Sequence, residues 1–136
     1  MDIDEALRFV RENPHGVLAT HRRSGDVQQS PVLAAADDRG RVLISTRETA
    51  VKVRNLRRRP RASLCQISGR FFGPWVQLTG PVEIVSLPEA MDLLVEYYRL
   101  VAGEHEDWEE YREAMERERR CVLVLTPEEA GPSVSG

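Results

Sequence analysis

The stretch VLISTRETAVKVRNLRRRPRASLCQI, residues 42–67, contains two strand-like segments joined by a short basic helix. Its two ends, VLISTRETA and ASLCQI, include mainly apolar runs of strand length. The middle part has a helical pattern until Pro60, which lacks the N–H group that a further helical turn needs. The stretch therefore predicts a strand, a helix and a second strand in direct succession.

The corner between the first strand and this helix is a candidate anion site. A helix N-terminus has unpaired backbone N–H groups and a partial positive charge, which attract phosphate. Ser45 and Thr46 add hydroxyl donors, and Arg47 and Lys52 add full charges suited to phosphate or carboxylate. In the alternative interpretation Thr46 only caps the helix, and the arginines at 57–59 interact with the C-terminal end of its dipole.

The chain has 136 residues, which predicts one domain over residues 1–130 and a frayed C-terminal tail over 131–136. Its net charge of −3 conceals an uneven distribution: residues 52–61 hold six basic groups, whereas 104–118 hold eight carboxylates and two arginines. The basic segment has neither base-stacking aromatic residues nor a nucleic-acid-binding motif beside it. A nucleic-acid partner is therefore not expected.

Membrane and metal sites are also not expected. No apolar run approaches the roughly 20 residues that span a bilayer, and the N-terminus is too acidic for a signal peptide. Cys65 and Cys121 lack the spacing of a metal or redox pair, and the three histidines are scattered. We expect a soluble, cytoplasmic protein with reduced core cysteines.

The N-terminal part of the sequence predicts a helix and a hairpin. Asp2 and Glu5 have the spacing of a capping box, and apolar residues follow at helical spacing until Asn13. Turn residues at 24–26 separate two extended runs, GVLATHRR and VQQSPVLAAA. A second turn over 37–40 leads into the strand that precedes the basic helix.

The C-terminal half predicts one long strand, two helices and a last strand. The run WVQLTGPVEIV, residues 75–85, reads as a strand with a bulge or bend at Gly80 and Pro81. A second capping box at Ser86 introduces a helix that ends at Gly103, and a further stripe over 108–115 favours core or dimer packing. CVLVLTP then completes six strands.

Six strands with short turns and three or four peripheral helices predict a mainly β fold, a closed or nearly closed antiparallel barrel. Side chains fill the interior of so small a barrel, so a sizeable ligand must bind outside it, in a groove shared with a second subunit.

Catalytic motifs are absent: no nucleophile elbow, dinucleotide fingerprint or phosphate-binding P-loop occurs in the sequence. His105 is a candidate general acid, although a histidine between helices more often forms a structural hydrogen bond. No catalytic residue is assigned. A bound redox molecule would supply the chemistry, and the protein would supply position and electrostatics.

Several segments resemble the split-barrel flavin and deazaflavin oxidoreductases. They are QQSPV, LISTRETAVKVRNLRRRPRASL, WVQLTGPVEIV, YYRLVAGEHEDWEEYREAM and RRCVLVLTP, which together span nearly the whole chain. The resemblance is greatest to the branch related to pyridoxamine 5′-phosphate oxidase that binds coenzyme F-420, a deazaflavin with a phosphate and an oligoglutamate tail. It implies a six-stranded antiparallel split β-barrel and a homodimer with the cofactor at the subunit interface.

The resemblance also implies a set of cofactor-binding residues. Lys52 corresponds to the lysine that holds the cofactor phosphate, and the strand VQQSPV corresponds to the one along which the ring lies. The oligoglutamate tail would extend toward basic groups such as Arg54 or Arg58. The implied contacts are Gln28, Ser30, Pro31, Val32, Ser45, Thr46, Arg47, Lys52 and Trp75, and burial in the barrel wall is the alternative for Trp75.

The sequence departs from the pattern of pyridoxamine 5′-phosphate oxidase itself. Gln29 and Ala34 stand where that enzyme has arginine and lysine, and Ala50 and Val51 stand where it has serine and arginine. These departures favour the F-420 branch over a vitamin B6 oxidase, and FMN is the alternative cofactor.

The function implied is transfer of a hydride from reduced F-420 to an unsaturated small organic acceptor. An FMN-dependent oxidase or reductase and a non-catalytic cofactor carrier are the alternatives, and a nucleic-acid module is a third. The loop GRFFGP and the partner subunit would shape the acceptor pocket, and the sequence does not identify the acceptor.

Overall fold

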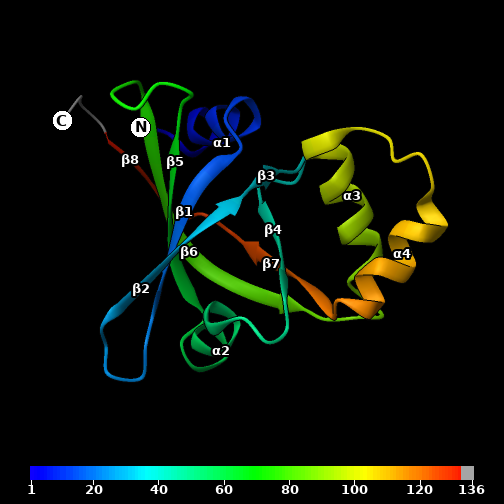
Figure 1. Ribbon diagram of the computed structural model, residues 1–136. Coiled ribbons are helices and arrows are strands. Elements are labelled where there is room, and N and C mark those ends of the chain that lie inside the picture. Colours follow the sequence, from blue (N-terminus) through cyan, green and yellow to red (C-terminus); the bar gives the residue numbers. More distant parts are fainter. Residues whose placement is uncertain (133–136) are drawn as a thin grey trace.

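The computed structural model describes residues 1–132, which form four helices and eight strands (Figure 1). The helices are α1 (Ile3–Glu12), α2 (Val51–Arg58), α3 (Met91–Ala102) and α4 (Trp108–Arg117). The strands are β1 (His15–His21), β2 (Val27–Leu33), β3 (Ala35–Ala36), β4 (Val42–Arg47), β5 (Arg61–Ile67), β6 (Trp75–Val85), β7 (Arg120–Leu125) and β8 (Glu129–Gly131). All paired strands are antiparallel, so the predicted mainly β, antiparallel fold is confirmed.

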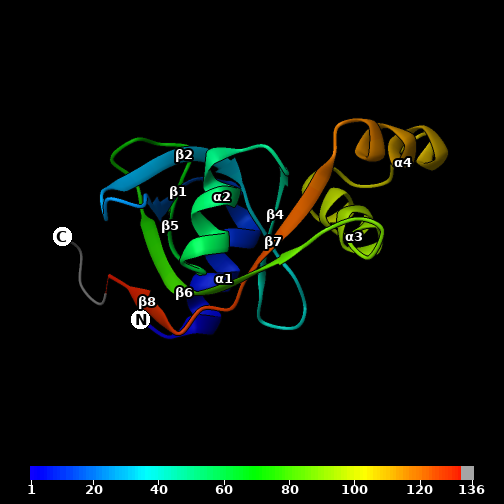
Figure 2. The same ribbon diagram turned by 90° about the horizontal axis from the view of Figure 1, so that it is seen from below.

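The strands form one curled sheet in the order β2-β1-β5-β6-β7-β4-β3, with β8 paired to β6 (Figures 1 and 2). The sheet curls until β2 approaches β4, so six strands form the wall of a split barrel. Two short strands were not predicted: β3, which the sequence joined to β2, and β8, which contains Gly131 of the predicted tail. Residues 133–136 of that tail lie outside the described residues.

The long strand β6 belongs to both halves of the barrel. Its first half pairs with β5 as far as Pro81, and its second half pairs with β7 from Val82 onward. Gly80, next to this change of partner, lies against the chain after β7: a Cβ atom there would be 2.1 Å from the carbonyl oxygen of Thr126. Glycine is therefore required where the predicted bend occurs.

Helices α1 and α2 close opposite ends of the barrel (Figure 1). α1 contributes the buried residues Ala6, Leu7 and Val10, and α2 contributes Val53 and Leu56. These side chains join the inward-facing residues of the strands in one core cluster. Burial of apolar surface therefore fixes both helices against the interior of the barrel.

The two predicted helix caps have different outcomes. Asp2 accepts a hydrogen bond from the Glu5 N–H at 2.8 Å, so the predicted start of α1 is confirmed. The box predicted at Ser86 is wrong, because α3 begins only at Met91 and has no side-chain cap. Ser86 instead donates its hydroxyl proton to the Glu48 carboxylate at 2.6 Å, which is a charge-assisted hydrogen bond.

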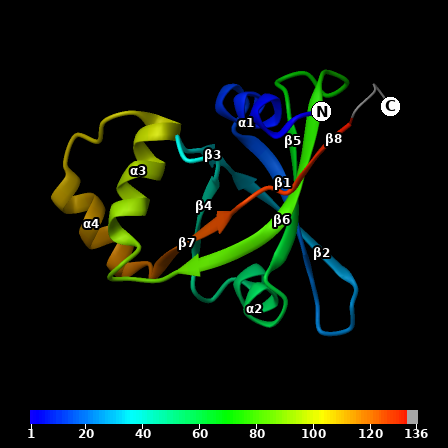
Figure 3. The same cartoon turned by 180° about the vertical axis from the view of Figure 1, so that it is seen from behind.

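Helices α3 and α4 cover the outer face of β4 and β7 (Figure 3). Leu43, Val122 and Val124 project from these strands into a second apolar cluster. Tyr111 of α4 is buried there and donates its hydroxyl proton to the Leu94 carbonyl of α3 at 2.8 Å. The predicted core role of the α4 stripe is therefore confirmed for Tyr111.

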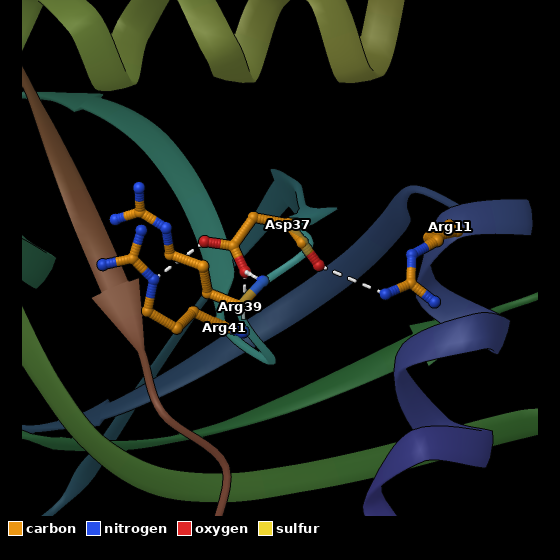
Figure 4. A network of polar contacts seen from close by, with 4 residues as sticks. All are labelled: Arg11, Asp37, Arg39 and Arg41. Atoms are coloured by element: carbon orange, nitrogen blue, oxygen red, sulfur yellow. Dashed lines mark hydrogen bonds and ion pairs between the residues drawn. The ribbon is translucent and has the colours of Figure 1, made fainter.

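Asp37 organises the turn between β3 and β4, which the sequence predicted (Figure 4). Its carboxylate accepts hydrogen bonds from the backbone N–H groups of Arg39 and Arg41, each at 2.9 Å, and from Nε of Arg41 at 2.8 Å. Arg11 of α1 donates to the Asp37 carbonyl oxygen at 3.1 Å. These bonds satisfy a carboxylate that is fully buried and join the turn to α1.

Both cysteines are free. Burial raises the pKa of the Cys121 thiol to about 11, so this thiol stays protonated in the barrel core. Cys65 is only half-buried, on the outer side of β5. Within residues 1–132, every helix is too short or too polar to cross a bilayer.

Candidate functional site

The corner between β4 and α2 has an open helix N-terminus. β4 ends at Arg47, and Ala50 is the N-cap residue of α2. Alanine has no side-chain acceptor, so no side chain caps the first-turn N–H groups. The alternative in which Thr46 caps the helix is wrong, because Thr46 lies inside β4 and is 5% exposed. The first turn of α2 is therefore available to an anion.

Lys52 lies in this first turn and is half-buried. Burial lowers its pKa, and the nearby charge of Arg120 lowers it further, whereas Cys121 acts in the opposite direction. Among the ion pairs of residues 1–132, none involves Lys52. A half-buried ammonium group without a carboxylate partner is favourable for an anionic ligand.

Arg120 adds positive charge near Lys52, and Arg47 lies next to Arg120. They face each other across β4 and β7 and share one oxygen of Glu118, at 3.6 Å from Arg47 and 2.9 Å from Arg120. The hydrogen bond from Arg120 lowers the pKa of Glu118, which therefore remains ionised. Two arginines thus share one carboxylate, so together with Lys52 the corner keeps an excess of positive charge.

Glu48 joins this corner to three other elements. Its carboxylate accepts from Arg57 of α2 at 2.5 Å and from Ser86 before α3 at 2.6 Å. Its backbone N–H donates to the carbonyl oxygen of Arg119, before β7, at 2.9 Å. Glu48 therefore neutralises Arg57 and fixes the conformation of the chain that leads to Lys52.

The predicted residues of the strands alternate between two sides. On β4, Thr46 faces the interior, whereas Ser45 lies on the outer side, so the two hydroxyl groups do not line the same surface. On β2, Gln28, Ser30 and Val32 are half-buried and the intervening residues, among them Pro31, are exposed. The buried Oγ of Ser30 has no hydrogen-bond partner among the described residues.

Trp75 is not brought to this corner within one chain. It begins β6 at the end of the barrel opposite α2 (Figure 1). Its side chain is 38% exposed and lines a cavity of about 310 Å³ with Gln77, Thr79 and β8. A ligand at Lys52 therefore meets Trp75 only if that residue comes from a second copy of the chain.

Within residues 1–132, one face of the barrel has no helix over it (Figure 1). We call it the open face: the outward side of β2, β1, β5 and the first half of β6. Residues that lie opposite each other on neighbouring strands form two rows across this face, and neither row contains a charged residue. Its exposed margins include Val27, Leu33, Ile67 and Trp75, which are 38–54% exposed. The rows are Pro31, Val17, Cys65 and Gln77, and Gln29, Ala19, Ser63 and Thr79.

A comparison of the sequence with known families identifies its relatives. A sequence model of the family described as pyridoxamine 5′-phosphate oxidase matches residues 3–133. The chain belongs to the pyridoxamine 5′-phosphate oxidase family. This is a family of split-barrel oxidoreductases that bind flavin-type cofactors, as the resemblance implied.

Solved structures show the same fold. A conserved hypothetical protein from Mycobacterium tuberculosis has a TM-score of 0.76 and 24% identity over 100% of this chain and 93% of its own. A protein described as an F-420 reductase has a TM-score of 0.70 and 20% identity, covering 91% of this chain and 94% of that one. An FMN-binding protein related to pyridoxamine 5′-phosphate oxidase, from Nostoc punctiforme, has a TM-score of 0.64 and 14% identity, with coverages of 94% and 78%.

The residues at the corner fit a phosphate-bearing cofactor of the pyridoxamine 5′-phosphate oxidase family. The ammonium group of Lys52 and the uncapped first turn of α2 suit the phosphate. The partnerless hydroxyl of Ser30, in the barrel wall, suits a polar atom of the ring. His105 makes the structural hydrogen bond that the sequence favoured: its Nδ1 accepts from the Asp107 N–H at 2.9 Å, and its ring centre lies 5.0 Å from that of Tyr98.

A further residue near this site, Tyr97, was not predicted from the sequence. Its hydroxyl donates to the Leu33 carbonyl at the end of β2 at 3.0 Å and lies beside the backbone of Ser45. Burial raises the pKa of Tyr97, while Arg120 and the hydrogen bond with the Ser45 backbone lower it. Tyr97 therefore bridges the two strands at the split of the barrel. It lies outside the apolar stripe of α3, so periodicity did not single it out.

Replacing Tyr97 with phenylalanine is expected to lower the free energy of unfolding by about 1 kcal/mol, because the hydrogen bond to Leu33 is lost. Urea unfolding followed by circular dichroism measures the change. The matched control is Tyr98→Phe, since the Tyr98 hydroxyl makes no hydrogen bond within residues 1–132. Equal stability of the two variants would contradict a bridging role for Tyr97.

Proposed function

We propose that this protein is an oxidoreductase that uses reduced coenzyme F-420 to transfer a hydride to an unsaturated small organic acceptor. The observation that carries the proposal is the half-buried Lys52, without a carboxylate partner, in the uncapped first turn of α2. A phosphate bound there would accept hydrogen bonds from the backbone and from a charged donor in the same place.

Each part of the site has a proposed role toward the cofactor. Lys52 and the first turn of α2 hold the phosphate, and Ser45, Thr46 and Arg47 lie along the strand that leads to it. Gln28, Ser30, Pro31 and Val32 on β2 lie along the ring, and Trp75 of a second copy covers it. When bound, F-420 supplies the hydride chemistry, and the protein aligns the ring with the acceptor and excludes water.

The oligoglutamate tail of F-420 needs basic groups beyond the corner. Arg58 was one candidate, but it donates to Asn55 at 3.1 Å and to the His21 carbonyl at 3.3 Å. Arg54 is exposed and makes no ion pair within residues 1–132. Arg54 is therefore the better candidate for a tail contact.

F-420 is favoured over FMN because this chain has uncharged residues at several positions where pyridoxamine 5′-phosphate oxidase has basic residues. Ala34 is fully buried in the barrel core, so a lysine at this position would not fit without rearrangement. Ala50, the N-cap residue of α2, provides no hydroxyl group. One structural neighbour is also described as an F-420 reductase. FMN remains the second candidate cofactor, since Lys52 and a helix terminus also suit its phosphate.

A paired titration tests the choice. Purified protein is titrated with F-420 and with FMN, and binding is followed by fluorescence quenching. We expect F-420 to bind more tightly and its reduced form to be oxidised by an acceptor from a panel of enones, quinones and tetrapyrroles. If FMN binds more tightly than F-420, FMN would replace F-420 as the proposed cofactor. Tight F-420 binding without turnover of any acceptor would instead favour a non-catalytic carrier.

We also propose that two copies associate through the open face, in the cytoplasm. The two uncharged rows on this face and its exposed apolar margin match the composition of a subunit interface. A second copy would also supply Trp75, which a single chain holds at the end opposite Lys52. The cofactor site would then be complete only in the dimer.

Replacing Cys65 with arginine is expected to weaken the dimer at least about tenfold, because the new charges would lie near the middle of the interface. Sedimentation or light scattering over a concentration series measures the dissociation constant, and F-420 affinity should fall with it. Glu83→Arg is the control, since Glu83 is exposed on the second half of β6. An unchanged dimer in the Cys65 variant would show that the subunits meet elsewhere.

A further inference from the structure

A chain of hydrogen bonds crosses the barrel from α2 to β2. Nη2 of Arg58 donates to Oδ1 of Asn55 at 3.1 Å, and Nδ2 of Asn55 donates to Oγ1 of Thr20 at 3.1 Å. The Thr20 hydroxyl then donates to Oε1 of Gln28 at 3.3 Å. Asn55 is 4% exposed and Thr20 is 0% exposed, so the middle of the chain is shielded from water.

The direction of every bond in this chain follows from Arg58. A guanidinium group can only donate, so the Asn55 amide must present its oxygen to Arg58 and its NH₂ group to Thr20. The Thr20 oxygen accepts that bond, and its single proton is then directed at Gln28. Gln28 must therefore present its oxygen inward. The opposite orientation would place two donors against each other and leave a buried group unsatisfied.

The consequence appears at the outer end of the chain. With Oε1 held by Thr20, the NH₂ group of Gln28 points away from the core, and one of its protons is donated to the Gln29 carbonyl at 3.2 Å. The second proton has no partner within the described residues. Gln28 thus ends the chain as a hydrogen-bond donor at the half-exposed surface of β2.

The same chain begins on the helix that carries Lys52. Asn55 follows Lys52 by three residues, so both side chains lie on one side of α2. Arg58 is held in place by its second bond, to the His21 carbonyl at 3.3 Å. The anion corner and the strand proposed to lie along the ring are therefore joined by one chain of hydrogen bonds.

We infer that Arg58, Asn55 and Thr20 are positioning residues that fix Gln28 as a hydrogen-bond donor to an acceptor atom of the bound cofactor ring, a carbonyl oxygen or ring nitrogen. This inference rests on the proposed function. A donor at such an atom stabilises negative charge that develops on the ring and selects a ring that has an acceptor at that edge. We call this chain of hydrogen bonds from Arg58 through Asn55 and Thr20 the relay. The relay determines that Gln28 presents its NH₂ group, and Gln28 itself makes the contact with the ring.

The sharpest variant is Asn55→Asp, which keeps the shape of the side chain and removes its donor. Its carboxylate would accept from both Arg58 and the Thr20 hydroxyl, so the Thr20 oxygen would become an acceptor toward Gln28. The Gln28 amide would then reverse and present its oxygen to the ring. Thr20→Val breaks the same chain, whereas Thr20→Ser keeps the hydroxyl and serves as its control. Arg59→Ala, at the C-terminal end of α2, is the control for lost positive charge.

Two readouts separate positioning from simple stability. In titrations with F-420, Asn55→Asp and Thr20→Val should bind about fivefold more weakly than wild type, and both controls should stay within twofold. At saturation, the absorption maximum of the bound ring should shift in these two variants. It should not shift in Lys52→Ala, which alters the phosphate contact. A variant that is only less stable would have a lower melting temperature, but the absorption maximum of the bound ring would not shift.

The outcomes distinguish this inference from the proposed function. If wild-type protein binds neither F-420 nor FMN, the proposed function fails. If it binds and both relay variants match wild type in affinity and spectrum, only the relay is overturned. Without cofactor, the side-chain NH₂ resonances of Gln28, assigned by their loss in Gln28→Glu, should move in Asn55→Asp and remain in place in Arg59→Ala. Unmoved resonances would also overturn the relay.

Discussion

Replacing Lys52 with alanine is expected to weaken cofactor binding by about 1–3 kcal/mol, the scale of a charge-assisted hydrogen bond. Lys52 is the one cation of the corner without a carboxylate partner among residues 1–132, since Arg47 and Arg120 share Glu118 and Arg57 is bound to Glu48. Its removal therefore takes away the charge that is most available to a phosphate. Fluorescence titration with F-420 and with FMN measures the loss.

The pH dependence of binding gives an independent check on Lys52. Burial lowers its pKa, so without ligand the ammonium group loses its proton at a lower pH than an ordinary lysine. Phosphate binding requires the protonated form. Wild-type affinity should therefore fall as the pH rises through this lowered pKa, and Lys52→Ala should show no such step. Arg59→Ala is the charge-matched control, and a Lys52 variant with wild-type affinity would remove the basis of the proposed site.

The same pKa affects stability with a defined sign. Between the lowered pKa of folded Lys52 and the ordinary value near 10.5, the unfolded chain binds more protons than the folded one. The contribution of Lys52 to the free energy of unfolding should therefore increase as the pH rises through this window. Denaturant unfolding of wild type and Lys52→Ala over this range isolates the contribution by difference.

Replacing Gly80 with alanine is expected to lower the free energy of unfolding by about 3 kcal/mol. The added Cβ atom would lie 2.1 Å from the carbonyl oxygen of Thr126, a separation that a van der Waals contact does not allow. The neighbour is backbone, so the strand itself must shift. That shift falls where β6 changes its partner from β5 to β7, and it would disturb both halves of the barrel.

Gly69→Ala is the matched control for Gly80→Ala. Gly69 lies in the connection between β5 and β6, where an added Cβ atom would have nothing within 4 Å. We expect a change within about 0.5 kcal/mol for this variant. Chemical denaturation of both proteins gives the comparison. Similar stability of the two variants would show that β6 relaxes at the corner at little cost.

Local patterns were sufficient to predict most of the fold. The start of α1 followed from the spacing of Asp2 and Glu5, because a side-chain cap involves only residues within one turn. The six wall strands followed from short apolar runs between turn residues. The prediction failed where a distant group intervened: Ser86 binds Glu48, which lies 38 residues away, and does not cap a helix. β8 was missed because its three residues form a strand only against β6.

The candidate site was predictable in part. Lys52 and the uncapped corner followed from the basic helix that comes directly after a strand. The side chains that surround Lys52 did not, because Arg120 reaches it through the pairing of β4 with β7. Tyr97 likewise reaches Ser45 only through the packing of α3 on β4. The spacing of residues along the sequence does not indicate such contacts, because the residues involved are far apart in the chain.

The sequence by itself determined the order of strands and helices, the first helix cap and the position of Lys52 at a helix N-terminus. Each of these depends on residues only a few positions apart, where periodicity and capping act. The tertiary structure alone decided how β6 divides between two partners, which face stays open, and how Asn55 meets Thr20, 35 residues away. Closure of the barrel brings such residues together, and contacts that depend on closure leave no local pattern in the chain.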